Sequence, residues 1–283
     1  MSSYPRLVRL PQLTLVPAVT LVIGAAFVAP ASSAPAVPDQ SLLGAVAAAS
    51  AGATPVVTPK LPLSGRTIVV DPGHQLGNSR FPRQINKLVD ARGLRKPCNS
   101  TGTATNAGFP EATFAWRVSK KLRNELISLG ATVLLTRTSN SKKLWGPCVD
   151  VRGKWGNKGF QGNTKDADLE ISIHGDGSSA GNHGFHVIVS TVSGTRTAST
   201  AYATKTRAAL DAAGFARSTY IGKGTAFSFR NDLGTINWAD MPAVMVELGN
   251  MRNKKDAAAM SSKDGRTRYA HALAQGVLAQ LTS

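Results

Sequence analysis

The sequence predicts an α/β fold: a single domain with a twisted, largely parallel central sheet flanked by helices. Short β-branched, apolar runs alternate along the chain with segments of helical periodicity, which is the pattern of strands joined by covering helices. Hydrophobic residues make up 42% of the 283 residues, enough for a packed core. Beyond the N-terminal segment, no apolar run reaches the roughly 20 residues of a membrane-spanning helix, so a polytopic membrane protein is excluded.

The first half of the domain contains two expected strands and one long expected helix. Residues 66–70 form a β-branched run that ends in a turn, and residues 131–136 form the next strand. Between them, residues 110–129 carry apolar side chains at helical spacing: Phe114, Val118, Leu122, Leu126 and Leu129. Pro110 suits the first helical position, and Gly130 suits the position just after the helix.

The second half repeats the alternation. The expected elements are a short helix at 149–157, strands at 168–174 and 185–190, a helix at 197–213, a strand at 241–247 and a last helix at 265–281. The strand at 168–174 alternates, with Leu169, Ile171 and Ile173 on one face. This order of elements supports a largely parallel sheet between helical layers.

The N-terminal region reads as an export signal followed by a linker. Residues 1–34 have two arginines, an apolar stretch and a small-residue tail that offers cleavage after Ala34. An uncleaved N-terminal anchor is the alternative, and both interpretations place the domain outside the cytoplasm. Residues 35–64 are rich in Ala and Pro and are expected to be a linker. The folded domain is expected to span residues 65–283.

The chain is strongly basic. It has 33 Lys plus Arg against 16 Asp plus Glu, a formal charge of +17. For an exported protein, this charge indicates attraction to an anionic cell-wall surface, reached by long-range steering that salt weakens. Nucleic acid is the rival partner for any basic protein. Export and the lack of a recognisable nucleic-acid module argue against it, so no nucleic-acid partner is expected.

The chain has two cysteines, Cys98 and Cys148, which exclude a cysteine zinc cluster and a disulfide-dense scaffold. In an exported domain they are expected to form one disulfide, with two free thiols as the alternative. The bridge would close a loop of about 50 residues and stabilise the fold by about 2–4 kcal/mol.

Four side chains with metal-binding or proton-transfer chemistry are expected at one edge of the sheet. His74 follows the first strand, and His174 and Glu247 end two others. Ligands of open α/β sheets bind beyond the carboxyl ends of the strands. Glu111 opens the long helix on its apolar face, where a carboxylate needs a cation or several hydrogen-bond donors. Taken singly, each has an ordinary structural role, such as capping or complementing a helix dipole. Together, two histidines and a glutamate form a catalytic zinc set that leaves a position for water, and the fourth residue is a nearby carboxylate that moves its proton.

Three segments carry a resemblance to a known family: Val70-Asp-Pro-Gly-His74, Ser172-Ile-His-Gly-Asp176 and Pro242-Ala-Val-Met-Val-Glu-Leu-Gly-Asn250. In this order they resemble zinc-dependent N-acetylmuramoyl-L-alanine amidases of the family-3 type, over essentially the whole chain from about residue 66. These enzymes are peptidoglycan hydrolases that cleave the amide between the lactoyl group of N-acetylmuramic acid and L-Ala of the stem peptide. The chain is most similar to small actinobacterial periplasmic amidases that lack a separate wall-binding domain and carry one disulfide.

The resemblance implies the amidase family-3 fold, one Zn²⁺ per chain held by His74, Glu111 and His174, and Glu247 as the catalytic acid/base. It also implies a basic insertion at 80–108 that shapes the groove, a periplasmic or wall location, and peptidoglycan or muropeptide fragments as substrate. We expect a monomer with no transmembrane segment after signal removal. The alternatives are another zinc peptidase acting on stem peptides and a catalytically inactive wall-binding or activator protein.

Other polar residues carry weaker expectations. Arg230 precedes the last catalytic strand and is a candidate ligand for a stem-peptide carboxylate, although solvated arginines are common in so basic a chain. His183 and His186 form an HxxH pattern, but residues three apart on a strand point to opposite faces, so both are interpreted as ordinary strand or loop residues. His271, on the last helix, is interpreted as a surface or core-edge group.

Overall fold

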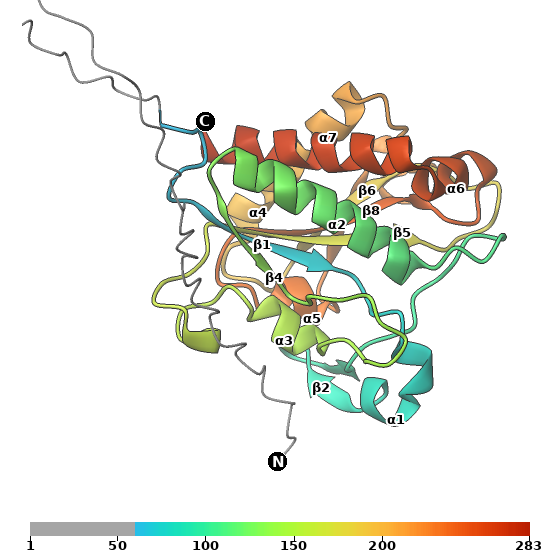
Figure 1. Ribbon diagram of the computed structural model, residues 1–283, viewed down its shortest axis with the longest axis horizontal. Helices are drawn as coiled ribbons and strands as arrows, with labels where there is room; N and C mark the ends of the chain where they lie inside the picture. The colour runs from blue at the N-terminus through green and yellow to red at the C-terminus, as the bar shows by residue number, and fades with distance from the viewer. Residues whose placement is uncertain (1–59) are drawn as a thin grey trace, which may run out of the picture. The chain divides into compact units, whose positions relative to one another are not determined.

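The computed structural model describes residues 60–283 (Figure 1). The predicted signal peptide at 1–34 and most of the predicted linker at 35–64 lie outside the described residues. Leu63 is fully buried, and its backbone N–H donates to the Leu129 carbonyl at 2.8 Å. The folded part therefore begins before the expected boundary at residue 65. None of the helices in the described part is long and apolar enough to cross a membrane.

The centre of the domain is a six-stranded sheet. Its strands lie in the order β4 (Thr132–Leu135), β1 (Thr67–Pro72), β5 (Leu169–Asp176), β8 (Ala243–Asn250), β6 (His186–Ser190) and β7 (Phe227–Arg230). The first four run parallel to one another, whereas β6 pairs antiparallel with β8 and β7 pairs parallel with β6. The predicted largely parallel α/β sheet is confirmed, with one antiparallel junction.

Helices cover both faces of the sheet (Figure 1). The thicker layer consists of α2 (Glu111–Ser128), α4 (Arg196–Ala212) and α7 (Lys263–Leu281), which is preceded by α6 (Lys254–Ser261). The thinner layer contains α3 (Val149–Gly153) and α5 (Gly234–Asn237). The predicted apolar stripe of α2 is buried in the main core, and Gly130 follows the helix in a left-handed conformation. Pro110 is the residue before α2 rather than its first residue.

The alternation of β8 assigns its side chains to two different cores. Val244, Val246 and Leu248 belong to the large core beneath α2, α4 and α7. Met245 belongs to a smaller core on the other face. Because successive side chains of a strand point to opposite faces, Glu247 shares the face of Met245. The thinner layer therefore leaves room near the carboxyl end of this face for a site.

The basic insertion contains structure that the sequence did not predict. It includes α1 (Pro82–Ile85) and an antiparallel hairpin of β2 (Leu88–Asp90) and β3 (Arg95–Pro97). Three short 3₁₀ turns complete the described helical elements, at Asn78–Arg80, Phe160–Gly162 and Gly222–Gly224. The insertion lies at the carboxyl edge of the sheet, where it forms one wall of the site described below.

Candidate active site

Three of the four predicted site residues converge on one point at the carboxyl edge of the sheet. His74 follows β1, His174 lies near the end of β5, and Glu111 is the first residue of α2. Glu111 Oε1 lies 2.9 Å from His74 Nε2 and 2.9 Å from His174 Nδ1, and the two nitrogens are 3.1 Å apart. These residues form the one cluster of this kind in the described part of the chain that has the ligands and spacing for a metal ion.

Backbone groups hold the converging side chains in place. Glu111 Oε2 accepts a hydrogen bond from the Thr103 N–H at 2.9 Å, and Oε1 accepts one from the Gly175 N–H at 3.2 Å. His74 Nδ1 donates to the Ser100 carbonyl at 3.2 Å, which leaves the Nε2 lone pair directed at the cluster. Burial raises the pKa of Glu111, but the two histidines outweigh burial and hold that pKa well below its usual range.

Two glycines allow the backbone to approach these ligands closely. A Cβ atom on Gly73 would lie 2.5 Å from the imidazole of His174. A Cβ atom on Gly102 would lie 2.8 Å from Glu111 Oε2 and 3.0 Å from the ring of His74, and Gly102 has a φ of +73°. A side chain at either position would displace a ligand, so the close packing of the cluster depends on glycine here.

A buried ion pair supports the segment that carries His74. Asp71 and Arg152 are in direct contact and both are almost fully buried. Asp71 also accepts a hydrogen bond from the Ser172 hydroxyl at 2.6 Å. The Arg152 guanidinium donates to the carbonyls of Pro72 at 2.9 Å and His74 at 2.7 Å. Burial raises the pKa of Asp71, but Arg152 and the hydroxyl donors outweigh it and leave that pKa below its usual value.

Glu247, the fourth predicted residue, lies beside the cluster on the same face of the sheet. In the sheet register it is the partner of His174 on β5 and of His186 on β6. Its Oε2 atom is buried and has no hydrogen-bond partner among the described residues. Burial raises the pKa of Glu247 well above its usual range, and the nearby carboxylates of Glu111 and Asp176 raise it further. A carboxyl placed beside metal-binding side chains, with one oxygen unpartnered among the described residues, suits acid/base chemistry.

The four residues open onto a cleft of about 860 Å³. Its lining comes from the insertion, from the ends of β5 and β8, and from the loop before α5. Asp176 and Asp232 add two further carboxylates to this lining, and Lys96 from β3 forms an ion pair with Asp232 at 3.0 Å. The insertion therefore shapes one wall of the groove, as predicted.

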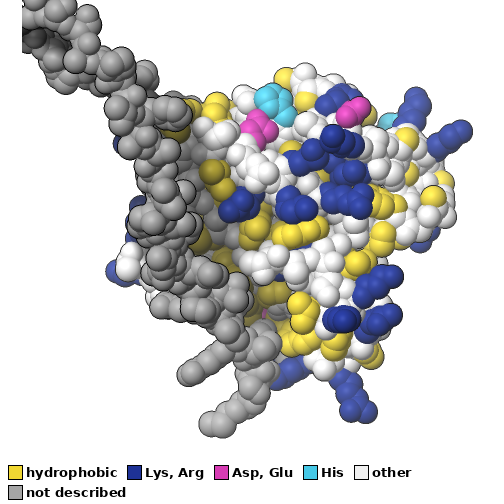
Figure 2. All heavy atoms as spheres, in the orientation of Figure 1, with side chains coloured by type: hydrophobic (Ala, Val, Ile, Leu, Met, Phe, Trp, Pro, Cys, Tyr) yellow, Lys and Arg dark blue, Asp and Glu magenta, His cyan; other side chains and the backbone are white. Residues whose placement is uncertain are grey.

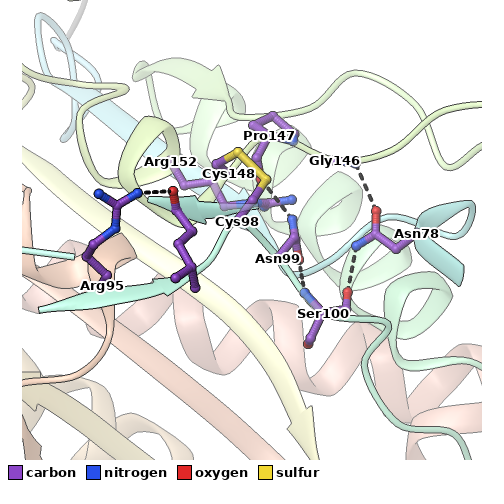
Figure 3. The surroundings of a disulfide bond; sticks show 10 residues. Asn78, Arg95, Cys98, Asn99, Ser100, Gly146, Pro147, Cys148 and Arg152 are labelled. Carbon is purple, nitrogen blue, oxygen red and sulfur yellow. Dashed lines mark hydrogen bonds between the residues drawn. A yellow bond between two sulfur atoms is a disulfide. The ribbon is translucent and has the colours of Figure 1, made fainter. Parts of the chain in front are cut away.

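The predicted disulfide between Cys98 and Cys148 is present and joins this wall to the start of α3 (Figure 3). Asn99, next to the first cysteine, donates to the Pro147 carbonyl at 2.8 Å. The following residue, Ser100, supplies the carbonyl that accepts from His74. The disulfide thus lies two residues from the backbone group that orients a predicted metal ligand.

The remaining predicted polar residues lie outside the cluster. Arg230 does not line the cleft and forms two hydrogen bonds of 2.8 Å with Asp232, so its role as a substrate ligand stays a prediction. His271 is exposed and pairs with Glu125 at 2.7 Å, which confirms it as a surface group. His183 lies in a loop. His186 is a buried strand residue, but its position opposite Glu247 was not predicted because strand register is set by distant segments.

The fold and these four groups together define a class of protein, an α/β protein with a ligand set for one metal ion beside a buried carboxyl. The family follows from the sequence. Residues 68–279 match the Amidase_3 family of N-acetylmuramoyl-L-alanine amidases, and the chain belongs to this family. It is therefore a peptidoglycan amidase.

Individual relatives agree with this assignment. The chain is 37% identical over 236 residues to the N-acetylmuramoyl-L-alanine amidase Rv3717 of Mycobacterium tuberculosis, covering 80% of this chain and 92% of the relative. The crystal structure of the amidase Ami1 of Mycobacterium abscessus superposes with a TM-score of 0.70 at 40% identity, over 77% of this chain and 99% of that one. Ami1 of Mycobacterium smegmatis gives 0.71 at 34% identity, over 77% and 98%.

Proposed function

We propose that this amidase is zinc-dependent, that His74, Glu111 and His174 hold one zinc ion, and that Glu247 is the catalytic acid/base. The bond cleaved is the amide between the lactoyl group of N-acetylmuramic acid and L-Ala of the stem peptide. The observation that supports this proposal most is the convergence of two imidazole nitrogens and one carboxylate oxygen within 3.1 Å of one another.

The donor set fits zinc. Zinc in proteins binds imidazole nitrogen and carboxylate oxygen at about 2.0–2.2 Å in tetrahedral geometry, which separates neighbouring ligand atoms by roughly 3.3 Å. The observed separations of 2.9, 2.9 and 3.1 Å are close to that value. Three protein ligands also leave a fourth position for water or substrate, as catalytic zinc sites do.

Each protein group then has a defined task in amide hydrolysis. When bound, zinc supplies a Lewis acid that polarises the amide carbonyl and acidifies water. Glu247 takes a proton from the attacking water and delivers it to the departing nitrogen of L-Ala. Ser100 fixes the orientation of His74 through its carbonyl, and Arg152 fixes the backbone that carries His74.

The location and the less specific contacts are part of the same proposal. The positive charge of the chain favours attraction to the anionic cell wall, and residues 1–34 would direct export, with 35–64 as a linker. Arg230 would bind a stem-peptide carboxylate by exchanging its contact with Asp232. If so, replacing Arg230 with Ala raises KM for substrates that carry a stem peptide, with little change in kcat. A single protein monomer is expected in sedimentation analysis.

Digestion of muramyl dipeptide and of polymeric peptidoglycan, followed by product mass, tests the reaction. Muramoyl glycans and intact stem peptides are the expected products, and they should disappear when zinc is chelated. Cleavage between amino acids would instead identify a stem-peptide peptidase, and binding without turnover would identify an inactive wall-binding protein.

Two variants test the residue assignments. Glu247→Gln should retain one zinc per chain by elemental analysis and lose turnover by about 10²–10⁴-fold, the usual contribution of a general acid/base. His174→Ala should lower the zinc content itself. Turnover preserved in Glu247→Gln would show that another group transfers the proton.

A further inference from the structure

A second groove lies on the outer side of α2, away from the cleft. It has a volume of about 670 Å³ and is bounded by α2 and the edge strand β4, and among the described residues none lines both it and the cleft. Four of its lining residues are cations from α2: Arg117, Lys120, Lys121 and Arg123. Figure 2 shows Lys and Arg side chains gathered on the face that lies over α2. We call this feature the α2 groove.

The positive charge of the α2 groove is not balanced within the described part of the chain. Arg117, Lys120 and Lys121 are spaced at i, i+3 and i+4, so they share one side of the helix, where like charges repel. None of the four α2 cations forms an ion pair with a carboxylate of the described residues. Burial and the neighbouring Arg117 guanidinium lower the pKa of Arg266, which also lines the groove. Repulsion between these positive charges raises the free energy of the unbound protein, and an anionic partner would relieve it.

The floor of the α2 groove is apolar and includes an aromatic ring. Trp116 and the β4 residues Val133 and Leu135 line it, and all three are half-buried. The Lys120 ammonium lies 5.5 Å from the centre of the Trp116 ring. An aromatic and aliphatic floor packs against the C–H face of a sugar ring, while flexible cations around it bind acidic groups. These features fit a glycan that carries acidic substituents.

We propose that the α2 groove is a second binding site for the anionic glycan polymer of the cell wall, distinct from the catalytic cleft. The acidic groups are carboxylates or phosphodiesters attached to that polymer. Binding there retains the enzyme on its substrate between cleavage events. The proposal does not depend on the metal site, because a protein unable to turn over substrate would still bind polymer through α2.

The test removes three groove cations in the variant Arg117→Gln/Lys120→Gln/Lys121→Gln. Binding to insoluble peptidoglycan with its phosphodiester polymers attached is measured by co-sedimentation at low and moderate salt. We expect affinity to fall by about tenfold or more at ~50 mM salt, with a smaller loss at higher salt, because salt screens such contacts. Cleavage of muramyl dipeptide, which is too small to span both sites, should stay unchanged.

A matched control removes the same charge elsewhere, in Lys142→Gln/Lys165→Gln/Lys255→Gln, three exposed positions outside the groove. Equal losses in the two variants would overturn the proposal, because net charge alone would then explain binding. Preferential binding of the groove to single-stranded DNA over wall polymer would overturn it as well. Peptidoglycan stripped of phosphodiester polymers by hydrofluoric acid identifies the acidic group: retained binding assigns carboxylates, and lost binding assigns phosphodiesters.

An independent observation concerns His186. The register across three strands places His174, Glu247 and His186 in one row on the same sheet face. Glu247 and His186 are antiparallel partners, and the Cβ atoms of such partners are generally about 4.5–5.5 Å apart. His186 is 3% exposed. Its Nδ1 atom and Glu247 Oε2 are both buried without a hydrogen-bond partner among the described residues. Tyr220 packs edge-on against the imidazole, and its hydroxyl donates to Asp176 at 2.8 Å.

We infer that His186 is a positioning residue for Glu247, whose inner oxygen accepts a hydrogen bond from the imidazole during turnover. Burial lowers the pKa of His186 to about 4, so the ring is neutral and carries one N–H donor. Anchoring one carboxylate oxygen leaves the other directed at the cleft. This inference rests on the acid/base role proposed for Glu247.

Comparison of His186→Leu with His186→Asn tests the inference, because the Asn amide nitrogen occupies the place of Nδ1. We expect Leu to lower kcat by about 10–100-fold with KM and zinc content unchanged, and Asn to restore most of the rate. In a Glu247→Gln background, His186→Leu should have no further effect. Equal loss in Leu and Asn, or a further loss in that background, would overturn the positioning role. Undiminished turnover of Glu247→Gln alone would instead show that the acid/base assignment is wrong.

Discussion

Glu170→Met is expected to stabilise the protein, because the native carboxyl is buried and has no hydrogen-bond partner in the described part of the chain. Glu170 is fully buried between its strand partners Val69 and Ala243, and neither carboxyl oxygen has a hydrogen-bond partner among the described residues. Leaving such a group unsatisfied costs about 1–3 kcal/mol. Methionine has a similar length and no group to satisfy, so the free energy of unfolding should rise by about that amount near pH 4, where the carboxyl is largely protonated in both the folded and the unfolded state. For a domain of this size the change corresponds to roughly 2–12 °C in Tm.

The gain should grow with pH. Burial raises the pKa of Glu170 well above its usual range, and the nearby Asp71 raises it further. Between the ordinary pKa of glutamate and this raised value, the folded protein keeps a proton that the unfolded chain has released. The contribution of Glu170 to wild-type stability therefore falls as pH rises through this window, by up to about 1.4 kcal/mol per pH unit. Methionine does not titrate, so the difference between variant and wild type widens from pH 4 to pH 8.

Urea denaturation of wild type, Glu170→Met and Glu170→Gln at pH 4, 6 and 8 measures this difference. The Gln variant is the matched control, since it removes the titration but keeps an unpartnered polar group. Its pH profile should parallel that of the Met variant with a smaller gain. A difference that does not change with pH, or a Met variant less stable than wild type at pH 8, would refute the reasoning.

Three further changes test the support of the site. Gly73→Ala should weaken zinc binding about tenfold or more, because its Cβ would lie 2.5 Å from the His174 ring. The control Gly181→Ala has open space around its Cβ and should leave zinc binding unchanged. Calorimetric titration with zinc measures both affinities. Arg152→Met leaves the buried Asp71 carboxylate without its ion-pair partner and should lower the free energy of unfolding in urea by about 3–5 kcal/mol. Unchanged stability would contradict the buried ion pair. Replacing Cys98 and Cys148 together by Ser should lower the free energy of unfolding by about 2–4 kcal/mol, measured by thermal unfolding. Unchanged stability would argue against a closed loop of 50 residues.

Much of the fold was predictable from the sequence because local patterns specify it. The helical spacing of Phe114 and Val118 defined α2, and the alternation of Leu169, Ile171 and Ile173 defined β5. His74, His174 and Glu247 were predictable because they lie at or near the carboxyl ends of strands, which meet at one edge of a parallel sheet. Glu111 was identified by its position on the apolar face of α2, where a carboxylate needs partners, and the structure places it against both histidines.

What the sequence did not predict depends on contacts between distant segments. Asp71 and Arg152 are 81 residues apart, so neither signals the other. The row formed by Glu247 and His186 requires the antiparallel register of β6, and loop lengths do not specify strand direction. The alternation of β5 puts Glu170 on the face opposite Leu169, Ile171 and Ile173, and the burial of that face depends on the thinner helical layer, which comes from distant segments.

X-ray diffraction from crystals grown with zinc, recorded on both sides of the zinc absorption edge, tests the central claim most directly. The account predicts one anomalous peak per chain, within bonding distance of His74 Nε2, Glu111 Oε1 and His174 Nδ1. A peak at any other place in the domain, with these three atoms unbound, would contradict it.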